Sequence, residues 1–302
     1  CTDKRAAYPL QTSRRQCFVG QTFKRIEYDK MEIADDFCPL KEIIMSINFY
    51  AVMVIYNRSL DESLSFSTLK NTGVEIFVCD NSTRDMKNPT FESERVHILS
   101  IGGNVGLSKA YNKAVESLDG RDGYICFFDD DTAVPENYFT LMEKEIEKTG
   151  ADILLPCVFD GNGYMSPCKI SGVSVSAISS LEELNEENIS GINSGMAVKT
   201  EVFKAYRYDE NYFLDFIDHK FLSDMKKQKR KIAAAKSVEL KQSFSANDFS
   251  DIKAARRRFS VFKKDYSLFC RQAGGLKNKL IGALVIAKRF ININFIGRLR
   301  SK

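Results

Sequence analysis

Three consecutive aspartates, Asp129, Asp130 and Asp131, follow an apolar run at Tyr124 to Phe128 and precede Pro135. Carboxylates this close repel one another unless a cation offsets their charge, and such hard oxygen ligands suit Mg²⁺ or Mn²⁺ bound to a diphosphate. Because alternate residues of an extended segment share a face, Asp129 and Asp131 should point together. A run of acids is often only a solvated turn, but its position directly after a strand-like run favours a metal site.

A second pair of carboxylates, Asp215 and Asp218, is embedded among apolar side chains. The pattern predicts a helix over 213–227, and residues three apart on a helix share a face. A carboxylate in apolar surroundings holds a proton more tightly, which suits a general base near neutral pH. A helix cap, or a salt bridge to Lys220 or Arg230, explains the same residues equally well.

Three further positions carry weaker signals. Asp80 closes an apolar run, where it can accept hydrogen bonds from a nucleobase or a ribose, although a turn aspartate is as common. The segment from Asn104 to Asn112 joins a Gly turn to a predicted helix, whose free N–H groups favour an anion. Its glycine spacing matches neither the GxGxxG nor the P-loop motif, and Asn112 is equally well explained as an exposed polar residue. His219 adjoins Asp218, and a lone histidine is more often structural.

The candidate residues lie between predicted strands and helices that alternate along the chain. Apolar, β-branched runs predict strands over 47–56, 74–79, 96–99, 124–128 and 152–159, and later over 192–199 and 232–240. Amphipathic spacing predicts helices over 59–70, 107–118 and 135–148. This alternation indicates an α/β fold with a mostly parallel sheet covered by helices on both faces. Ligands bind such sheets at the carboxyl ends of the strands, where the aspartates lie.

The charge is unevenly distributed along the chain. Positions 251–302 hold 14 Lys and Arg residues against two acids, whereas the whole chain has a net charge of +4. The basic segment flanks apolar residues such as Leu284, Val285, Ile286, Phe290 and Phe295. It predicts an interfacial helix over 280–296 on an anionic membrane, with a packed helix of basic outer face as the alternative. The longest apolar runs are far shorter than the ~20 residues needed to span a bilayer.

Histidine and cysteine usage narrows the chemistry further. The chain has two His residues, so carboxylates must hold any catalytic metal. Its eight Cys residues form no CxxC pair, which argues against a zinc ribbon or a thioredoxin-type site. Cys79 and Cys126 lie in apolar runs, as expected of free thiols in a reducing, cytosolic compartment.

Six segments between Ile47 and Ser245 resemble, in order, family 2 glycosyltransferases with the GT-A fold: AVMVIYNR, VCDNST, NVGLSKAYNKAV, FFDDDTAVP, NSGMAVKTEVF and FLDFIDHKF. They most resemble the bacterial rhamnosyltransferase-like branch, which builds surface polysaccharides. The resemblance implies inverting, metal-dependent transfer of a sugar from dTDP-rhamnose or a UDP-sugar to a lipid-linked saccharide acceptor. The enzyme would be cytoplasmic and peripheral at the inner face of the cell membrane.

The same resemblance assigns roles to single residues. Asp218 matches the general base, and Asp129 and Asp131 match the metal-binding acids. Residues that would border the donor are Tyr56, Asn57, Asp80, Asn104, Gly106, Leu107, Asn112, Asp129 and Asp130. Residues that would shape the acceptor cleft are Asn193, Ser194, Gly195, Asp215 and His219. The sequence departs from the branch at Lys220, where Glu is frequent.

The resemblance also implies three regions along the chain. Residues 1–45 form an extension of uncertain role, 46–245 a GT-A domain, and 246–302 a basic helical region. Within the domain, 46–150 would be the nucleotide-binding half and 151–245 the acceptor half.

Two other functions fit parts of the sequence. A nucleotidyltransferase that makes sugar nucleotides should carry a Gly-rich basic loop after the first strand, which YNRSLDESL lacks. A non-catalytic nucleotide- or phosphate-binding protein accounts for the basic end but not for three adjacent aspartates, which repel phosphates without a metal. For the same reason we expect no nucleic-acid partner.

Overall fold

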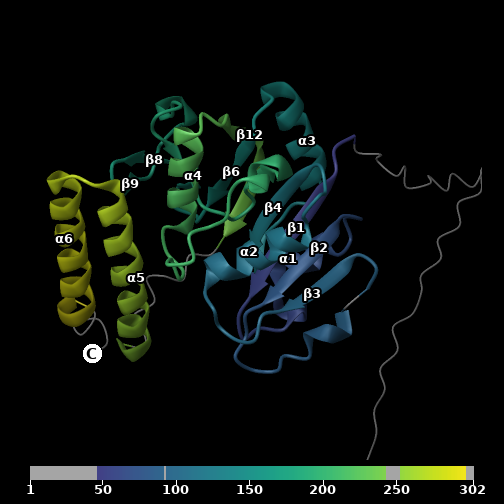
Figure 1. The fold of residues 1–302 in the computed structure, drawn as a ribbon, viewed down its shortest axis with the longest axis horizontal. Helices are drawn as coiled ribbons and strands as arrows, with labels where there is room; N and C mark the ends of the chain where they lie inside the picture. Colours follow the sequence, from purple (N-terminus) through teal and green to yellow (C-terminus); the bar gives the residue numbers. More distant parts are fainter. Residues whose placement is uncertain (1–45, 92, 243–251, 297–302) are drawn as a thin grey trace, which may run out of the picture. The chain divides into compact units, whose positions relative to one another are not determined.

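The computed structural model describes residues 46–91, 93–242 and 252–296, and the structural statements below concern those residues (Figure 1). The predicted extension, 1–45, lies outside them, as does the predicted boundary between residues 245 and 246.

Four parallel strands form the part of the sheet that carries the aspartates. They lie in the order β3 (Val96–Ser100), β2 (Glu75–Asp80), β1 (Phe49–Ile55) and β4 (Tyr124–Asp129). The register pairs Asp80 with both Ile55 and Ser100, and Asp129 with Val54. The carboxyl ends of all four strands therefore lie nearly level at one edge, and the predicted α/β fold is confirmed.

The second half of the sheet mixes strand directions. β11 (Ala197–Lys199) is antiparallel to both β4 and β6 (Ile153–Phe159), and β12 (Ile232–Gln242) runs parallel to β6. The short strands β5 (Thr132–Ala133) and β7 (Tyr164–Ser166) pair with β12 and β6. The strand predicted over 192–199 is thus limited to its last residues, because the preceding ones turn around Gly195, whose φ is 73°.

A second sheet was not predicted. It contains β10 (Ile189–Ser190), β8 (Cys168–Ser171) and β9 (Ser174–Ser176), all antiparallel. β9 is exposed along its whole length, so it has no hydrophobic alternation for a sequence reading to detect.

Helices cover both faces of the large sheet. Tyr50 and Val52 of β1 belong to one buried cluster with α2 (Leu107–Ser117) and α4 (Ile217–Lys227), whereas Ala51 and Met53 face α1 (Leu64–Leu69) and α3 (Tyr138–Thr149). Successive strand side chains point to opposite faces, so both clusters use the same strands. Helix α3 begins three residues after Pro135, because a turn from the Pro135 carbonyl to the Tyr138 N–H precedes it.

Cysteines in the described part of the chain behave as small apolar residues. Cys79 and Cys126 are buried and free, as predicted, and so are Cys157, Cys168 and Cys270.

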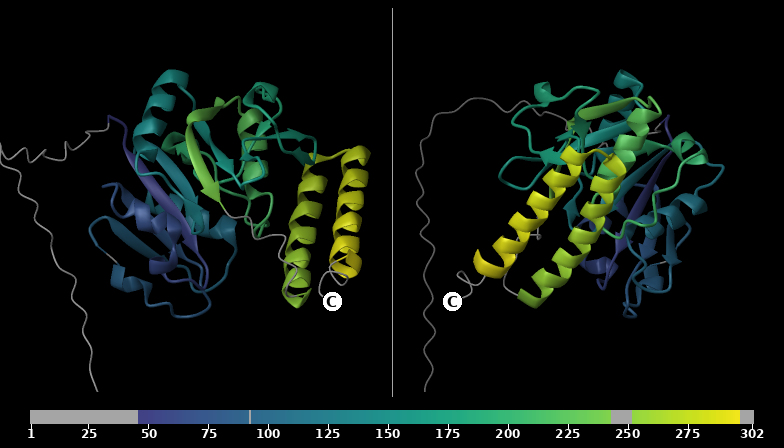
Figure 2. Two further views of the ribbon diagram at one scale, coloured as in Figure 1. Left: turned by 180° about the vertical axis from the view of Figure 1, so that it is seen from behind. Right: turned by 60° about the vertical axis from the view of Figure 1, so that its left-hand side comes forward.

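Two long helices end the described chain. α5 (Ile252–Ala273) and α6 (Leu276–Ile291) pack side by side and are joined at Gly274 and Gly275, both with positive φ (Figure 2). Phe262, Tyr266, Phe269 and Cys270 of α5 enter the same buried cluster as α2 and α4. Helix α6 ends at Ile291 in a π-helical turn, Asn292–Ile296, so the single helix predicted over 280–296 is wrong in its bounds. No helix within the described ranges is long and apolar enough to cross a bilayer.

Candidate active site

Asp129 and Asp131 converge on one atom. Asp129 ends β4, and Gln242 ends β12, where it pairs with Thr132 directly after Asp131. The Gln242 side-chain Nε2 donates to Oδ2 of Asp129 at 2.9 Å and to Oδ1 of Asp131 at 3.0 Å. One donor that reaches both carboxylates requires their oxygens to face a common point. The two side chains thus point together as predicted, although Asp131 lies in a turn and not in an extended segment. The Gln242 Oε1 is buried and has no hydrogen-bond partner in the described part of the chain.

The electrostatics of this point favour a cation. Burial raises the pKa of the Asp129 carboxyl to about 6; the Gln242 hydrogen bond opposes this, and the charges of Asp131, Asp130 and Asp218 add to it. A divalent ion between the carboxylates would remove that repulsion. Among the residues described, no three His, Cys, Asp or Glu side chains form a metal-binding group. Mg²⁺ is commonly held by only two carboxylates together with substrate phosphates, so the pair fits such an ion.

Asp130 points elsewhere. Its Oδ1 lies 3.3 Å from Nη1 of Arg58, and its backbone carbonyl accepts from the Leu64 N–H at 3.0 Å. Burial raises the pKa of the Asp130 carboxyl, and Arg58 opposes that rise. Asp130 is therefore committed to the loop after β1, and the structure does not place it with the other two aspartates against a donor.

The loops after β1 and β2 are tied together. Asn57, at φ 50°, accepts at Oδ1 from the Thr83 N–H at 2.9 Å, and its own N–H donates to Ser82 Oγ at 2.8 Å. Asp80 Oδ1 accepts from the Ser82 N–H at 3.0 Å. Tyr56 is half exposed beside them. The structure thus brings Tyr56, Asn57 and Asp80 to the same edge, where Asn57 braces the loop by its side chain.

The start of α2 is held by a distant loop. Gly106 has a φ of 94°, and a Cβ there would lie 2.9 Å from the Phe213 carbonyl oxygen. The Leu107 N–H donates to that same carbonyl at 2.6 Å. The first helical N–H is therefore used within the protein and is not one of the free N–H groups expected to favour an anion. Asn104 is exposed and accepts at Oδ1 from Asn81 at 3.1 Å.

The Asn112 side chain holds α2 to the backbone of Tyr208. Its Nδ2 donates to the Tyr208 carbonyl at 3.0 Å, and its Oδ1 accepts from the Tyr208 N–H at 2.8 Å. Because both ends of the buried amide are occupied, the expected contact of Asn112 with a donor is not supported.

The predicted pairing of Asp215 and Asp218 on one helix face is wrong. Helix α4 begins at Ile217, and Phe216 before it has the left-handed φ of 62°. Asp215 therefore precedes the helix, and its carboxylate forms a two-pronged ion pair with Arg258 of α5, in which Nη2 reaches Oδ1 at 2.6 Å. The salt bridge that the sequence left open exists, but with neither Lys220 nor Arg230.

Asp218 lies near enough to Asp129 for its charge to act on that carboxyl. It lies half-buried in the first turn of α4, where its Oδ1 accepts from the His219 N–H at 2.7 Å. Its charge contributes to the raised pKa of Asp129. The charges of both carboxylates also act on Tyr111, whose pKa is raised chiefly by burial. Within the described ranges no cation forms a salt bridge with Asp218, in contrast to Asp215.

The expected cleft residues are mostly internal. His219 is buried and its Nδ1 lies 2.8 Å from Ser190 Oγ. Ser194 Oγ lies 2.6 Å from Thr132 Oγ1, and a Cβ at Gly195 would collide with Leu240. Asn193 is also buried, but its Oδ1 has no hydrogen-bond partner among the described residues. Of this set, Asn193 alone therefore keeps a buried polar atom for a ligand.

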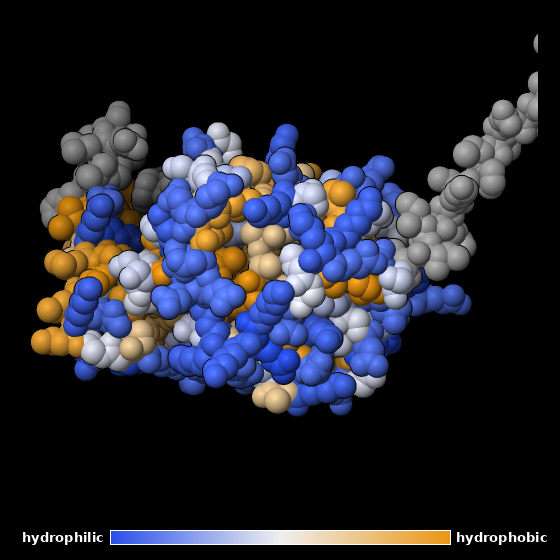
Figure 3. All heavy atoms as spheres, turned by 90° about the horizontal axis from the view of Figure 1, so that it is seen from above, coloured by the Kyte–Doolittle hydropathy of each residue, from blue (hydrophilic) through white to orange (hydrophobic). Residues whose placement is uncertain are grey.

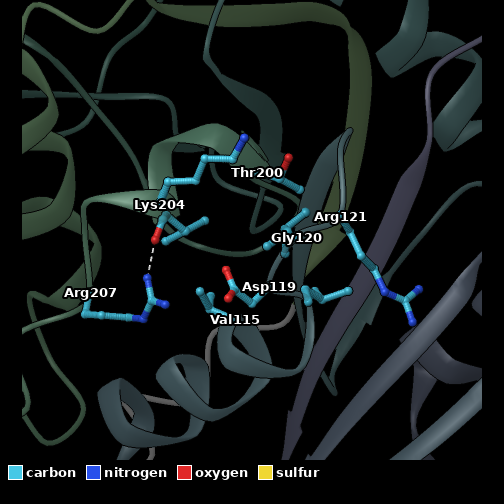
Figure 4. Close-up of a pocket in the computed structure, with 10 residues that line it drawn as sticks. Val115, Asp119, Gly120, Arg121, Thr200, Lys204 and Arg207 are labelled. Carbon is cyan, nitrogen blue, oxygen red and sulfur yellow. Dashed lines mark hydrogen bonds between the residues drawn. The ribbon is translucent and has the colours of Figure 1, made fainter.

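A separate pocket lies near the opposite end of β4 (Figure 4). Its walls include Arg121, Lys204 and Arg207. Arg121 pairs with Glu75, and Arg207 donates to the Phe203 carbonyl. The pocket contains none of the predicted site residues.

Gln242 is the contact that the sequence reading missed. It lies 113 positions from Asp129 and beyond the predicted end of its strand at 240, so no local motif connects the two. A polar residue at the carboxyl end of a later strand is the single signal that could have pointed to it.

Comparison with known proteins gives a consistent picture. A model of the family "Glycosyl transferase family 2" matches residues 50–208. The dTDP-rhamnosyl transferase RfbF of Shigella flexneri is 29% identical over 182 residues, which are 58% of this chain and 62% of that protein. The match thus spans less than two thirds of that relative's length.

Solved structures of low sequence identity also match this chain. TarS of S. aureus gives a TM-score of 0.49 at 15% identity, covering 82% of this chain and 44% of that one. GalNAc-T7, solved with UDP, GalNAc and Mn²⁺, gives a TM-score of 0.52 at 13% identity, covering 84% and 57%. The GalNAc-T7 likeness concerns the fold alone. Since the family model matches more than half of the sequence, the chain belongs to glycosyl transferase family 2.

Proposed function

We propose that this chain is an inverting glycosyltransferase that moves a sugar from a nucleotide diphosphate to an acceptor hydroxyl. The observation that carries the proposal is that the Asp129–Asp131 pair lies at the carboxyl ends of the strands with a third carboxylate, Asp218, near it. Asp129 and Asp131 converge on a common point, and Asp218 lies near enough for its charge to act on Asp129. Such a transfer needs a metal–diphosphate site with a carboxylate near it that can take a proton.

The donor would bind along the edge formed by β1, β2 and β4. Tyr56, Asn57 and Asp80 would border the nucleotide, as the level strand ends support. Asp129 and Asp131 would hold Mg²⁺ or Mn²⁺, which supplies positive charge to the leaving diphosphate when bound. The relative named as a dTDP-rhamnosyl transferase favours dTDP-rhamnose as donor, with a UDP-sugar as the alternative.

Asp218 would act as the general base. It takes the proton of the acceptor hydroxyl while that oxygen attacks the anomeric carbon, and the bond from this carbon to the diphosphate breaks with its electrons leaving on the phosphate oxygen. Asp215 is excluded from this role because Arg258 neutralises it. Asn193, whose Oδ1 is buried without a described partner, is the residue best placed to contact the sugar or acceptor.

We further propose that α6 lies on an anionic membrane and brings the enzyme to a lipid-linked saccharide acceptor. Leu276, Leu280 and Leu284 are spaced by four residues and form one exposed stripe; Leu276 is 74% and Leu284 71% exposed. Figure 3 shows hydrophobic atoms gathered on the side of the molecule where α6 lies. Lys277 and Lys279 flank the stripe, as in helices that bind the interface. The enzyme would then work in the cytoplasm, at the inner face of the membrane.

A donor screen tests the reaction. Sugar nucleotides are incubated with the full chain and Mn²⁺ or Mg²⁺, and hydrolysis and transfer are measured with Asp131→Ala and Asp218→Asn as controls. We expect turnover of one donor, abolished by a chelator and by Asp131→Ala, and strongly lowered by Asp218→Asn. Metal-dependent nucleotide binding without turnover would favour a non-catalytic binder, and neither binding nor turnover would overturn the donor site.

A further inference from the structure

Asp265 of α5 is a buried carboxylate whose hydrogen-bond partners, among the residues that the structure describes, are all backbone N–H groups. It is 0% exposed, and its oxygens accept from the N–H groups of three consecutive residues. The distances are 3.1 and 3.2 Å from Phe213, 2.8 Å from Leu214 and 2.9 Å from Asp215. A buried charge is tolerated only where such donors surround it, and successive N–H groups of one loop make a cradle for an anion. Here the anion in the cradle is the Asp265 carboxylate.

The same helix holds this loop by two further contacts. Arg258 pairs with the Asp215 carboxylate. The Phe216 ring stacks on Tyr266 at 4.6 Å and on Phe269 at 5.2 Å between centroids. Phe216 has a φ of 62°, a conformation that a bulky side chain adopts only when its surroundings impose it. Helix α5 therefore contacts every residue from 213 to 216.

This loop joins the two sides of the candidate active site. At its start, the Phe213 carbonyl accepts from the Leu107 N–H at 2.6 Å and covers Gly106 on the donor side. At its end, Ile217 begins α4, whose first turn carries Asp218. A displacement of residues 213–216 would consequently move Asp218 relative to the Asp129 edge.

We propose that Asp265 is a positioning residue for the transfer: it fixes loop 213–216 and thereby sets the direction of Asp218. The inference rests on the proposed role of Asp218 as base. Asp265 touches neither donor nor acceptor and acts only through the loop backbone. Its carboxylate is the right group for this task, because an amide in its place has one accepting oxygen and presents N–H where the loop also presents N–H.

The test compares Asp265→Asn with Asp122→Asn in the full chain. The control makes the same chemical change in a side chain that is 90% exposed. Hydrogen exchange is measured first, because it does not depend on any reaction. We expect faster exchange of residues 213–219 in Asp265→Asn, with strands β1 to β4 unchanged and no effect in the control. Faster exchange throughout the sheet would make Asp265 a residue of general stability and overturn the proposal.

Kinetics then test whether the loop serves the base. With the best donor of the screen, Asp265→Asn should lower kcat by roughly 10²-fold, as misplacement of a catalytic group does, while KM for the donor stays near its original value. In an Asp218→Asn background the same substitution should cause no further loss. If the loss of kcat in the double variant equals the product of the two single losses, Asp265 acts independently of Asp218 and the proposal is overturned.

Two other results remain decisive. If Asp265→Asn does not fold, Asp265→Glu keeps the charge but shifts it by one methylene group, and unchanged turnover in that variant would overturn the proposal. If the unaltered chain turns over no sugar nucleotide, the proposed function fails, whereas the exchange measurement still decides whether Asp265 holds the loop.

Discussion

The two carboxylate sites are held by different means. Asp129 is placed by the register of neighbouring parallel strands, and Asp131 follows two residues later in the turn, so their convergence follows from a short stretch of sequence. Asp218 is placed by loop 213–216, which has no strand partner and depends on contacts from α5, some fifty positions later. The proposed metal-binding edge can thus be recognised from local pattern, whereas the position of the proposed general base depends on a distant helix.

The largest effect is expected from replacing Asp218, the proposed general base. Asp218→Asn should lower kcat by roughly 10²–10⁴-fold, because the amide cannot take the acceptor proton. Nucleotide binding, measured by calorimetry with Mn²⁺, should persist. Asp224→Asn on the same helix, where the carboxylate pairs with Lys220, is the matched control. Turnover of Asp218→Asn within a few-fold of the unaltered chain would exclude the residue as base.

A substitution at Gln242 tests whether Asp129 and Asp131 keep their orientation without a contact from β12. Gln242→Ala removes the amide that bridges Asp129 and Asp131, so Mn²⁺ affinity should fall by about 10–100-fold, the usual effect of losing a supporting contact at a metal site. Calorimetric titration of Mn²⁺ measures it. Gln228→Ala, at an exposed position after α4, should leave the affinity unchanged. Equal affinities in both variants would show that the strands alone orient the carboxylates.

The exposed stripe of α6 can be tested apart from both sites. Replacing Leu280 and Leu284 with Asn together should weaken binding to vesicles containing anionic lipid by roughly tenfold or more, since each exposed Leu loses apolar burial. Flotation of the protein with vesicles gives the affinity. Val175→Asn, which alters an exposed apolar residue of β9, is the control. Unchanged binding of the double variant would remove α6 from the membrane surface.

The smallest effect concerns pH. The folded protein raises the pKa of Asp129 from its ordinary value of 3.8 to about 6, so protonation favours the folded state between these values. Without metal, the stability contribution of Asp129 should therefore grow as pH falls from 7 towards 4. Thermal melts in a chelator, compared between the unaltered chain and Asp129→Asn at pH 5 and pH 7, measure it. Added Mn²⁺ should reverse the trend, because metal and proton compete for the carboxylate. An identical pH dependence in both proteins would contradict the burial of that charge.

Much of the fold follows from residue pattern, and the failures have physical causes. The strands of the parallel half were predictable because strands buried on both faces form near-continuous apolar runs, and the aspartates follow directly after one such run. The helix start at Ile217 was not, since Phe216 takes a left-handed conformation that stacking on Tyr266 imposes. Asn112 resembles a surface residue in sequence, yet Tyr208 occupies its amide. In each case a contact between distant segments overrode the local preference.

The bonds of Asp265 have a consequence for how this loop can vary between related sequences. Each of them ends on a main-chain N–H, so the carboxylate is indifferent to the side chains at 213, 214 and 215. The hydrogen bonds to Asp265 therefore tolerate almost any residue at these positions. Proline is the exception, because it lacks the backbone N–H. The hydrogen bonds to Asp265 would survive a change of side chain at 213 or 214, whereas a change at 215 would also remove the ion pair with Arg258.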